Sequence, residues 1–162
     1  MASGIGVDEE VIRVYEDMKM RKGDVKSRKK MVCFCLNENM TKIIVEKDVE
    51  ILNEDVGSKF KDPYTECVNL LPKDDCRYLL LDVSYCTKES SKEDLVFMFW
   101  APENAPVKKK MMYASSKDAV KKKLSGIRCE LQVSSRDDVL DRSFLASKLK
   151  GDITSIEGVG IH

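Results

Sequence analysis

Few side chains in this chain of 162 residues are of the types that carry out covalent chemistry. The single histidine, His162, is the last residue of the sequence, so a Ser-His-Asp triad or a histidine-rich zinc site would have to be built from a chain end. The acid pairs Glu9-Glu10 and Asp137-Asp138 stand where helices are expected to begin, and the helix macrodipole favours carboxylates there. No Gly-x-x-x-x-Gly-Lys loop is present to hold a phosphate. We therefore expect a binding protein that is not an enzyme and that uses no cofactor and no metal.

The distribution of charge indicates the kind of partner. The chain has 28 Lys and Arg against 28 Asp and Glu, so its net charge is zero. Residues 19–30 and residues 108–123 nevertheless each hold seven basic residues and one acid, which gives each segment a charge of +6 and leaves −12 on the remainder. Basic segments of this kind favour an anionic partner, such as a phosphoinositide, a nucleic acid or an acidic protein surface.

Helical periodicity over residues 108–124 separates a core stripe from an opposite, exposed row. The core stripe consists of Met112, Tyr113, Ser116, Ala119, Val120 and Leu124. The exposed row consists of Met111, Ser115, Asp118 and Lys122, and it is bordered by Lys110 and Lys121. An exposed methionine among lysines suits docking into an apolar cleft with an acidic rim. Two alternatives leave Met111 without this role: the helix bends at Ser115-Ser116, or the C-terminal segment covers the methionine.

The remaining elements must position this helix. Apolar periodicity and turn residues predict helices over residues 9–20, from Pro63 to about Leu71, and over 137–149. They predict strands over 31–36, 42–46, 77–85, 95–100 and 128–133, an edge strand with Ile153 and Ile156, a basic loop at 21–30 and a charged turn at 87–94. Tight hairpins between strands require antiparallel pairing. We therefore expect an α+β fold with a mixed sheet of five to six strands between helices, in a single domain over residues 1–162 with a flexible segment at 1–7.

The lack of a membrane-spanning segment and of a signal peptide predicts the cellular compartment of the protein. No apolar run approaches the roughly 18–20 residues of a membrane span, and no signal peptide is visible, so we expect an intracellular protein with its six cysteines reduced. Cys33 and Cys35 are two residues apart in an apolar run, so we expect them buried on one face of a strand.

Five segments carry a more specific pattern. They are DDCRY at 74–78, KEDLVF at 92–97, FWAPE at 99–103, AP at 105–106 and KMMYASSKDAVKKKL at 110–124. Together they resemble the ADF/cofilin family of actin-binding proteins, and residues 1–4 and 17–19 resemble its animal members. The resemblance extends over essentially the whole chain. It implies the ADF-homology or gelsolin-like fold, and binding to monomeric and filamentous actin with a preference for ADP-actin, followed by filament severing and depolymerisation.

The resemblance also implies where actin binds. One surface would bind both monomers and filaments through Ser3, Lys108, Lys110, Met111 and Ser115. A second, filament-specific surface would contain Lys92, Asp94, Lys148 and Lys150. Two separated surfaces are what a protein needs to bridge two actin subunits.

Regulation follows from the same resemblance. Ser3 would be an inhibitory phosphorylation site, served by a kinase and a phosphatase, because phosphate adds about −1.5 to −2 charges. The phosphoinositide-binding residues would be Lys108, Lys110, Lys121, Lys122 and Arg128. Cys129 stands where many animal members carry a pH-sensing histidine, so we expect reduced pH dependence of severing and lipid binding. Ser147 stands near the position where members often carry an acid, so filament affinity could differ in strength.

Localisation and assembly are further expectations. A nuclear localisation motif would consist of Lys26, Arg28, Lys29 and Lys30, interrupted by Ser27. We expect a monomer in the cytoplasm, on the actin cytoskeleton, with import into the nucleus and no nucleic-acid partner. The main alternative is a phosphoinositide-binding peripheral adaptor that uses the lysines without severing. Such an adaptor needs neither an exposed methionine nor the turn with Lys92 and Asp94.

Overall fold

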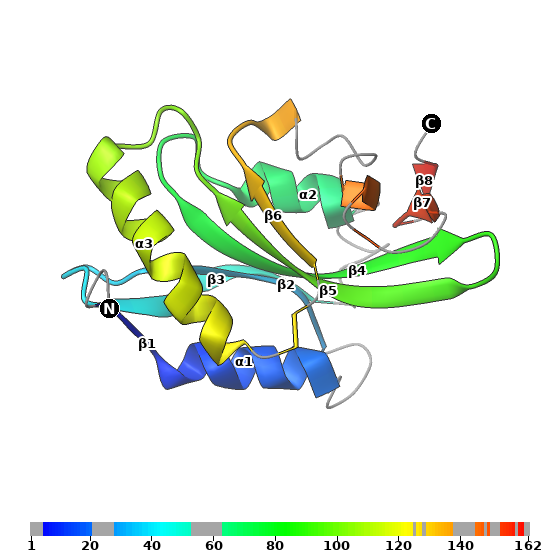
Figure 1. Cartoon of the computed structure of the whole chain (residues 1–162), viewed down its shortest axis with the longest axis horizontal. Coiled ribbons are helices and arrows are strands. Elements are labelled where there is room, and N and C mark those ends of the chain that lie inside the picture. The colour runs from blue at the N-terminus through cyan, green and yellow to red at the C-terminus, as the bar shows by residue number, and fades with distance from the viewer. Residues whose placement is uncertain are drawn as a thin grey trace.

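A mixed β-sheet forms the centre of the computed structural model (Figure 1), which describes residues 5–20, 28–52, 63–124, 126–127, 129–137, 145–147, 149, 153–157 and 159–160. The strands follow one another across the sheet as β1 (Gly6–Val7), β3 (Lys42–Leu52), β2 (Lys29–Leu36), β4 (Arg77–Thr87), β5 (Ser91–Trp100) and β6 (Cys129–Val133). In addition, β7 (Ile153–Ile156) pairs with β4, and β8 (Val159–Gly160) pairs with β7. The β1–β3 and β5–β6 pairs are parallel and the others are antiparallel.

Helices cover both faces of this sheet. On one side lie α1 (Glu9–Met20) and α3 (Val107–Lys123), and on the other lies α2 (Pro63–Leu70), as Figure 1 shows. Side chains alternate along β4, so Tyr78 and Leu80 enter the core under α1 and α3, whereas Leu79 and Leu81 enter the opposite core. The prediction of an α+β fold with a mixed sheet between helices is therefore confirmed, and the two short strands β1 and β8 were not predicted.

The first helix has the predicted boundaries. Its backbone begins with a hydrogen bond from Val11 N to Asp8 O of 3.1 Å, and its first turn carries Glu9 and Glu10. Val11, Val14, Tyr15 and Met18 are buried against the sheet, as the apolar spacing requires.

Two predicted loops are wrong. The basic loop expected at 21–30 ends earlier, because β2 begins at Lys29, which pairs with Leu52 of the unexpectedly long β3. The charged turn expected at 87–94 is a turn at residues 88–90 only. Lys92 and Asp94 lie within β5, opposite Tyr85 and Val83, because the ladder of backbone hydrogen bonds continues through charged residues whose side chains reach solvent.

The C-terminal part is described in pieces. The predicted helix at 137–149 lies largely outside the described residues. Two residues of this segment that the structure does describe, Leu145 and Leu149, are buried in the core on the α2 side. The predicted strand with Ile153 and Ile156 is confirmed as β7, but it is not an edge strand, because it pairs with β4 on one side and with β8 on the other. Within the parts of the chain that the structure describes, no helix is both long enough and apolar enough to span a membrane.

Candidate functional site

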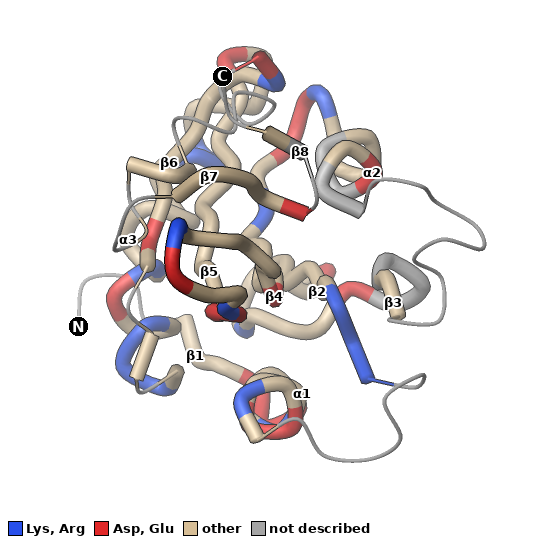
Figure 2. The backbone as a smooth tube through the Cα atoms, turned by 90° about the vertical axis from the view of Figure 1, so that its right-hand side faces the viewer, with Lys and Arg blue, Asp and Glu red and all other residues tan. Residues whose placement is uncertain are grey.

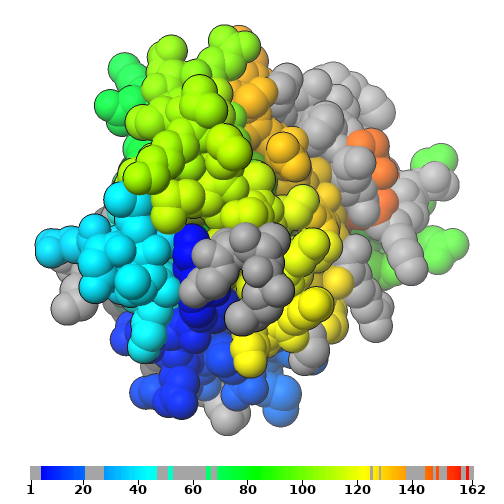
Figure 3. Space-filling view, turned by 60° about the vertical axis from the view of Figure 1, so that its left-hand side comes forward, coloured from blue at the N-terminus to red at the C-terminus, as the bar shows by residue number. Residues whose placement is uncertain are grey.

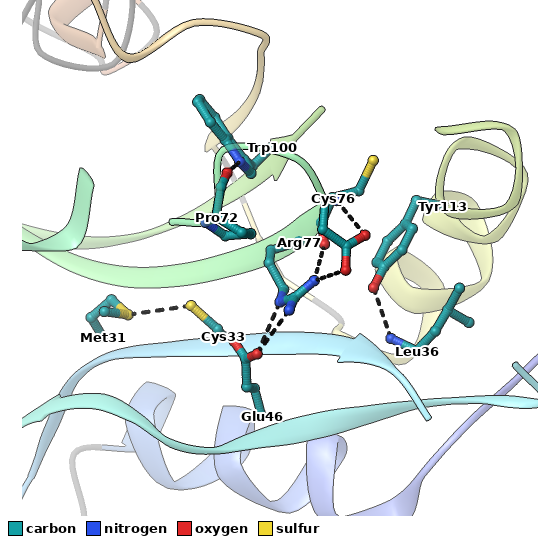
Figure 4. A network of polar contacts seen from close by, with 10 residues as sticks. Met31, Cys33, Leu36, Glu46, Pro72, Cys76, Arg77, Trp100 and Tyr113 are labelled. Carbon is teal, nitrogen blue, oxygen red and sulfur yellow. Dashed lines mark hydrogen bonds and ion pairs between the residues drawn. The ribbon is translucent and has the colours of Figure 1, made fainter. Parts of the chain in front are cut away.

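Two tyrosines fix the orientation of α3 on the sheet. The amide of Leu36, at the end of β2, donates a hydrogen bond of 2.9 Å to the hydroxyl of Tyr113, which is 1% exposed (Figure 4). The hydroxyl of Tyr78 on β4 donates to the backbone carbonyl of Tyr113. Burial raises the pKa of both phenols, so both stay protonated at neutral pH. With Val120 also buried, α3 has one inward face and cannot rotate without breaking these contacts.

Met111 lies on the outward face of α3. Its side chain is 67% exposed, and Val107, one turn earlier, is 71% exposed. The helix continues through Ser115 and Ser116, whose hydroxyls donate to the carbonyl of Met112 at 3.1 and 2.8 Å. The predicted exposure of Met111 is therefore confirmed. The helix is continuous through Ser115 and Ser116, and no described residue covers the methionine.

Charged and polar side chains surround this methionine. Lys108 and Ser115 are exposed, and the Lys110 ammonium donates to the carbonyl of Glu103 at 3.0 Å, which holds its charge near the start of the helix. We call Lys108, Lys110, Met111 and Ser115 the α3 surface. Figure 3 shows α3 crossing the centre of one face of the molecule, beside the β2–β3 turn and above α1.

Glu130 on β6 restrains the lysines further along α3. Its carboxylate is paired with Lys117 at 3.2 Å and, more closely, with Lys121. Partial burial raises the pKa of Glu130, but the hydrogen bonds and charges of Lys121 and Lys117 outweigh burial and leave this pKa below its ordinary value. Lys121 is therefore engaged within the protein, whereas Lys122 is exposed.

Lys92 and Asp94 lie on the projecting end of the β4–β5 hairpin. Lys92 is exposed, and half-buried Asp94 accepts a hydrogen bond of 2.5 Å from the hydroxyl of Tyr85 on β4. Burial and the neighbouring Asp94 raise the pKa of Tyr85 to about 12, so the phenol is a neutral donor at physiological pH. Figure 2 views this end of the hairpin, where basic and acidic residues meet. We call Lys92 and Asp94 the hairpin surface.

The structure separates these two sets of residues. The α3 surface and the hairpin surface lie towards opposite ends of the molecule in Figure 1, at the left and at the right. Ser3, Lys26, Arg128, Lys148 and Lys150 lie outside the described residues. Lys30, expected in an accessible basic loop, is instead 5% exposed in β2, where its ammonium pairs with Glu157 at 2.7 Å.

Some residues of the site were not predicted from the sequence. Glu130 and Tyr85 are strand residues with no distinctive sequence pattern, and only the spatial neighbours Lys121 and Asp94 reveal what they do. Arg77 is a further example, since it bonds Glu46 at 3.0 Å and Asp75 at 2.8 Å at the base of β4 (Figure 4). The sequence offered only the alternation of side chains along a strand. This pattern predicts which face of the sheet a side chain lies on, but not which residue it contacts.

The thiols near this network are unreactive. Burial raises the pKa of Cys33 to about 12 and that of Cys76 to about 11, which keeps both protonated. Cys33 is buried as predicted, but Cys35 is only half-buried. Among the described residues, no cluster of three or more His, Cys, Asp or Glu side chains is arranged to hold a metal ion.

These features define a class: a protein that presents an exposed methionine among lysines on a helix held rigidly against a mixed sheet. Residues 4–150 match the model of the family described as "Cofilin/tropomyosin-type actin-binding protein". The chain therefore belongs to the ADF/cofilin family, and actin is the partner that membership implies.

Solved structures agree with this assignment. The chain is similar to the cofilin of Streptomyces griseoflavus, with 30% identity, a TM-score of 0.71, and coverage of 90% of this chain and 96% of the other. It is similar to actin depolymerization factor 2 of Plasmodium berghei, with 26% identity, a TM-score of 0.74, and coverage of 90% and 99%. It is also similar to the ADF of Toxoplasma gondii, with 35% identity, a TM-score of 0.55, and coverage of 86% and 97%.

Proposed function

We propose that this protein binds monomeric and filamentous actin, with a preference for ADP-actin, and that it severs and depolymerises filaments. The observation that carries the proposal is the exposure of Met111, 67% of its surface, on a helix that lies within the residues 4–150 matched by the family model. Lys110, beside Met111, belongs to the segment 110–124 that resembles the family. The relatives from Plasmodium berghei and Toxoplasma gondii are named for actin depolymerisation, which supports the same activity here.

The α3 surface would form the contact shared by monomers and filaments. A methionine side chain is flexible and polarisable, so it can fill an apolar cleft on actin, while Lys108 and Lys110 pair with acidic groups at the rim. Ser115 and, outside the described residues, Ser3 would complete this contact. Ile5 is buried and the amide of Gly6 donates to Thr41 O at 3.0 Å, so the chain is fixed to the sheet edge near α3 from Ile5 onwards. Residues 5–7 therefore differ from the flexible segment expected at 1–7.

The hairpin surface would contact a second subunit of the filament. Lys92 and Asp94 belong to it, together with Lys148 and Lys150, which lie outside the described residues. A protein that binds the twisted filament more tightly than the untwisted one shifts the filament towards the twisted form by that difference in affinity. Strain at the boundary between decorated and bare segments would then break the filament. No covalent step is needed.

Regulation would act on the α3 surface. A phosphate on Ser3 would bring about −1.5 to −2 charges next to actin's acidic surface and weaken binding, with a kinase and a phosphatase setting its level. Phosphoinositides would bind Lys108, Lys110, Lys122 and Arg128, each worth about 1 kcal/mol near an anionic membrane, and Lys121, which would exchange its pair with Glu130 for the lipid. Because Lys108 and Lys110 serve both partners, lipid and actin would compete.

Localisation follows the partner. We propose that the protein acts as a monomer in the cytoplasm, on the actin cytoskeleton, and that it enters the nucleus through the basic residues Lys26, Arg28 and Lys29. Lys30 is committed to its ion pair with Glu157, so it contributes nothing to import by the folded chain.

Co-sedimentation with filaments and a monomer-binding assay test the proposal. The double variant Lys108→Ala/Lys110→Ala should bind actin monomers about tenfold or more weakly, because loss of charged interface residues commonly costs 1–3 kcal/mol. Lys123→Ala is the matched control, since this exposed lysine at the end of α3 lies outside the α3 surface. A wild-type protein that binds phosphoinositide vesicles but neither form of actin would instead identify the adaptor.

A further inference from the structure

The edge of β4 that faces β2 is covered by two different strands. β2 pairs with β4 from Tyr78 to Leu81, and β7 pairs with the same strand from Tyr85 to Thr87. The other edge of β4 is occupied by β5 from Arg77 to Cys86. A gap in this ladder therefore remains at Ser84, which has no register partner in β2 or in β7.

Glu157, directly after β7, fills this gap. Its amide donates to the carbonyl of Ser84 at 2.7 Å, and its own carboxylate accepts a hydrogen bond of 2.9 Å from the amide of Ser84. One residue thus satisfies both backbone groups of Ser84. To do so it adopts a φ of 51°, a left-handed conformation that residues other than glycine rarely adopt.

Lys30 of β2 completes the junction. Its ammonium lies 2.7 Å from the same carboxylate and 3.3 Å from the hydroxyl of Ser84. The side chains of Lys30 and Glu157 are each only 7% exposed, so removal of one partner would leave the other as a buried, unpaired charge. We call Lys30, Ser84 and Glu157 the β2–β4–β7 clasp.

The clasp lies across β4 from the hairpin surface. Ser84 is the ladder partner of Glu93, the residue between Lys92 and Asp94, and Val83 and Tyr85 are opposite Asp94 and Lys92 respectively. Beyond Leu81, β2 no longer pairs with β4, so the projecting half of the hairpin is held on that edge by β7 and Glu157. The backbone position of Ser84 therefore fixes where Lys92 and Asp94 point.

We propose that Lys30 and Glu157 are positioning residues for the filament-specific surface, acting through Ser84. This inference rests on the proposed function, in which Lys92 and Asp94 contact the filament. It predicts a selective effect, because the α3 surface lies towards the other end of the molecule and is fixed by Tyr113 and Tyr78 instead.

The first test uses no actin. In Glu157→Gln and in Lys30→Met, amide hydrogen exchange at residues 91–94 should become about tenfold faster or more, while exchange in α3 stays unchanged. Glu46→Gln is the matched control, because it makes the same change in another partly buried ion pair, with Arg77, at the base of β4. It should leave exchange at 91–94 unchanged.

The second test compares the two forms of actin. Glu157→Gln should bind filaments about 3- to 10-fold more weakly, with monomer affinity unchanged. In the double variant Lys30→Met/Glu157→Gln the loss should be no larger than in the single variant, since one junction is broken in both cases. General destabilisation would instead lower both affinities, and the Glu46→Gln control would share that loss.

The outcomes separate the two proposals. Unchanged exchange at residues 91–94, or equal losses of filament and monomer affinity, would overturn the positioning role of the clasp. If the wild-type protein binds no actin, the proposed function fails. In that case faster exchange would still support the mechanical coupling of the clasp to the hairpin, and the assignment of that hairpin to filament binding would be overturned.

Discussion

Met111 and Met20 allow the central contact to be tested at the scale of one residue. Both methionines are exposed, by 67% and 65%, and both lie on helices. Only Met111 lies between Lys108 and Ser115 on the α3 surface, whereas Met20 ends α1. Exposure alone is common among apolar residues, so the neighbours of Met111 and its fixed orientation distinguish it.

Met111→Ala should therefore weaken binding to actin monomers by about 1–2 kcal/mol, roughly 5- to 30-fold, as expected for an interface residue that fills a pocket. The midpoint of thermal unfolding should stay unchanged, because the side chain makes few contacts in the free protein. Met20→Ala is the control in the same fluorescence titration and should bind like the wild type. Equal affinities for all three proteins would remove Met111 from the interface.

At the scale of elements, α3 is a rigid support because polar bonds fix its register on the sheet. The hydroxyl of Tyr113 accepts from Leu36 N at 2.9 Å in a buried site, and the rings of Tyr113 and Tyr78 pack with centroids 5.2 Å apart. At its other end, α3 is tied to β6 by the pairs of Lys117 and Lys121 with Glu130.

Tyr113→Phe tests the first of these attachments. The substitution leaves the buried amide of Leu36 without an acceptor, which should lower the free energy of unfolding by about 1–3 kcal/mol. For a domain of this size the midpoint of thermal unfolding should fall by about 2–4 °C for each kcal/mol. An unchanged midpoint in calorimetry would mean that the Leu36 amide finds another partner and that this bond does not hold α3.

Glu130→Gln tests the second attachment through pH. Because the pKa of Glu130 is lower in the folded protein than in the unfolded chain, its ion pairs stabilise the fold above the unfolded pKa of about 4.3. This contribution is lost as the pH falls through the folded pKa, and partial exposure limits it to less than about 1 kcal/mol. The wild type should therefore be more stable than Glu130→Gln near pH 6, and this advantage should shrink as the pH falls below the unfolded pKa of about 4.3. Chemical denaturation measures the free energy of unfolding of both proteins. An advantage of the wild type that grows towards pH 3 would contradict the lowered pKa of Glu130.

At the scale of the whole molecule, the sequence predicted most elements and the outward face of α3 but not the junctions between elements. Helix boundaries at Glu9 and Pro63 and the exposure of Met111 follow from local periodicity, which a single segment carries by itself. The strand residues Lys30 and Lys92 were assigned to loops because charge was taken as a sign of turns. Lys30 is tolerated in β2 only because Glu157, distant in sequence, lies 2.7 Å away, and no local pattern reports such a partner.

The same limit applies to the two surfaces. Their residues could be named by family resemblance, yet their separation across the molecule depends on the sheet order, which places the β4–β5 hairpin end away from α3. A protein with two separated contacts can join two subunits, whereas one with a single basic helix can only coat a partner. The whole-molecule claim is therefore that both surfaces act together on a filament.

Fluorescence imaging of single actin filaments tests this claim most directly. The wild-type protein should bind along filaments and produce breaks. The triple variant Lys108→Ala/Lys110→Ala/Met111→Ala and the variant Lys92→Ala should each remain folded and produce few breaks, because each lacks one of the two surfaces. Filaments that stay intact with the wild type, or that break at the same rate with all three proteins, would contradict the account.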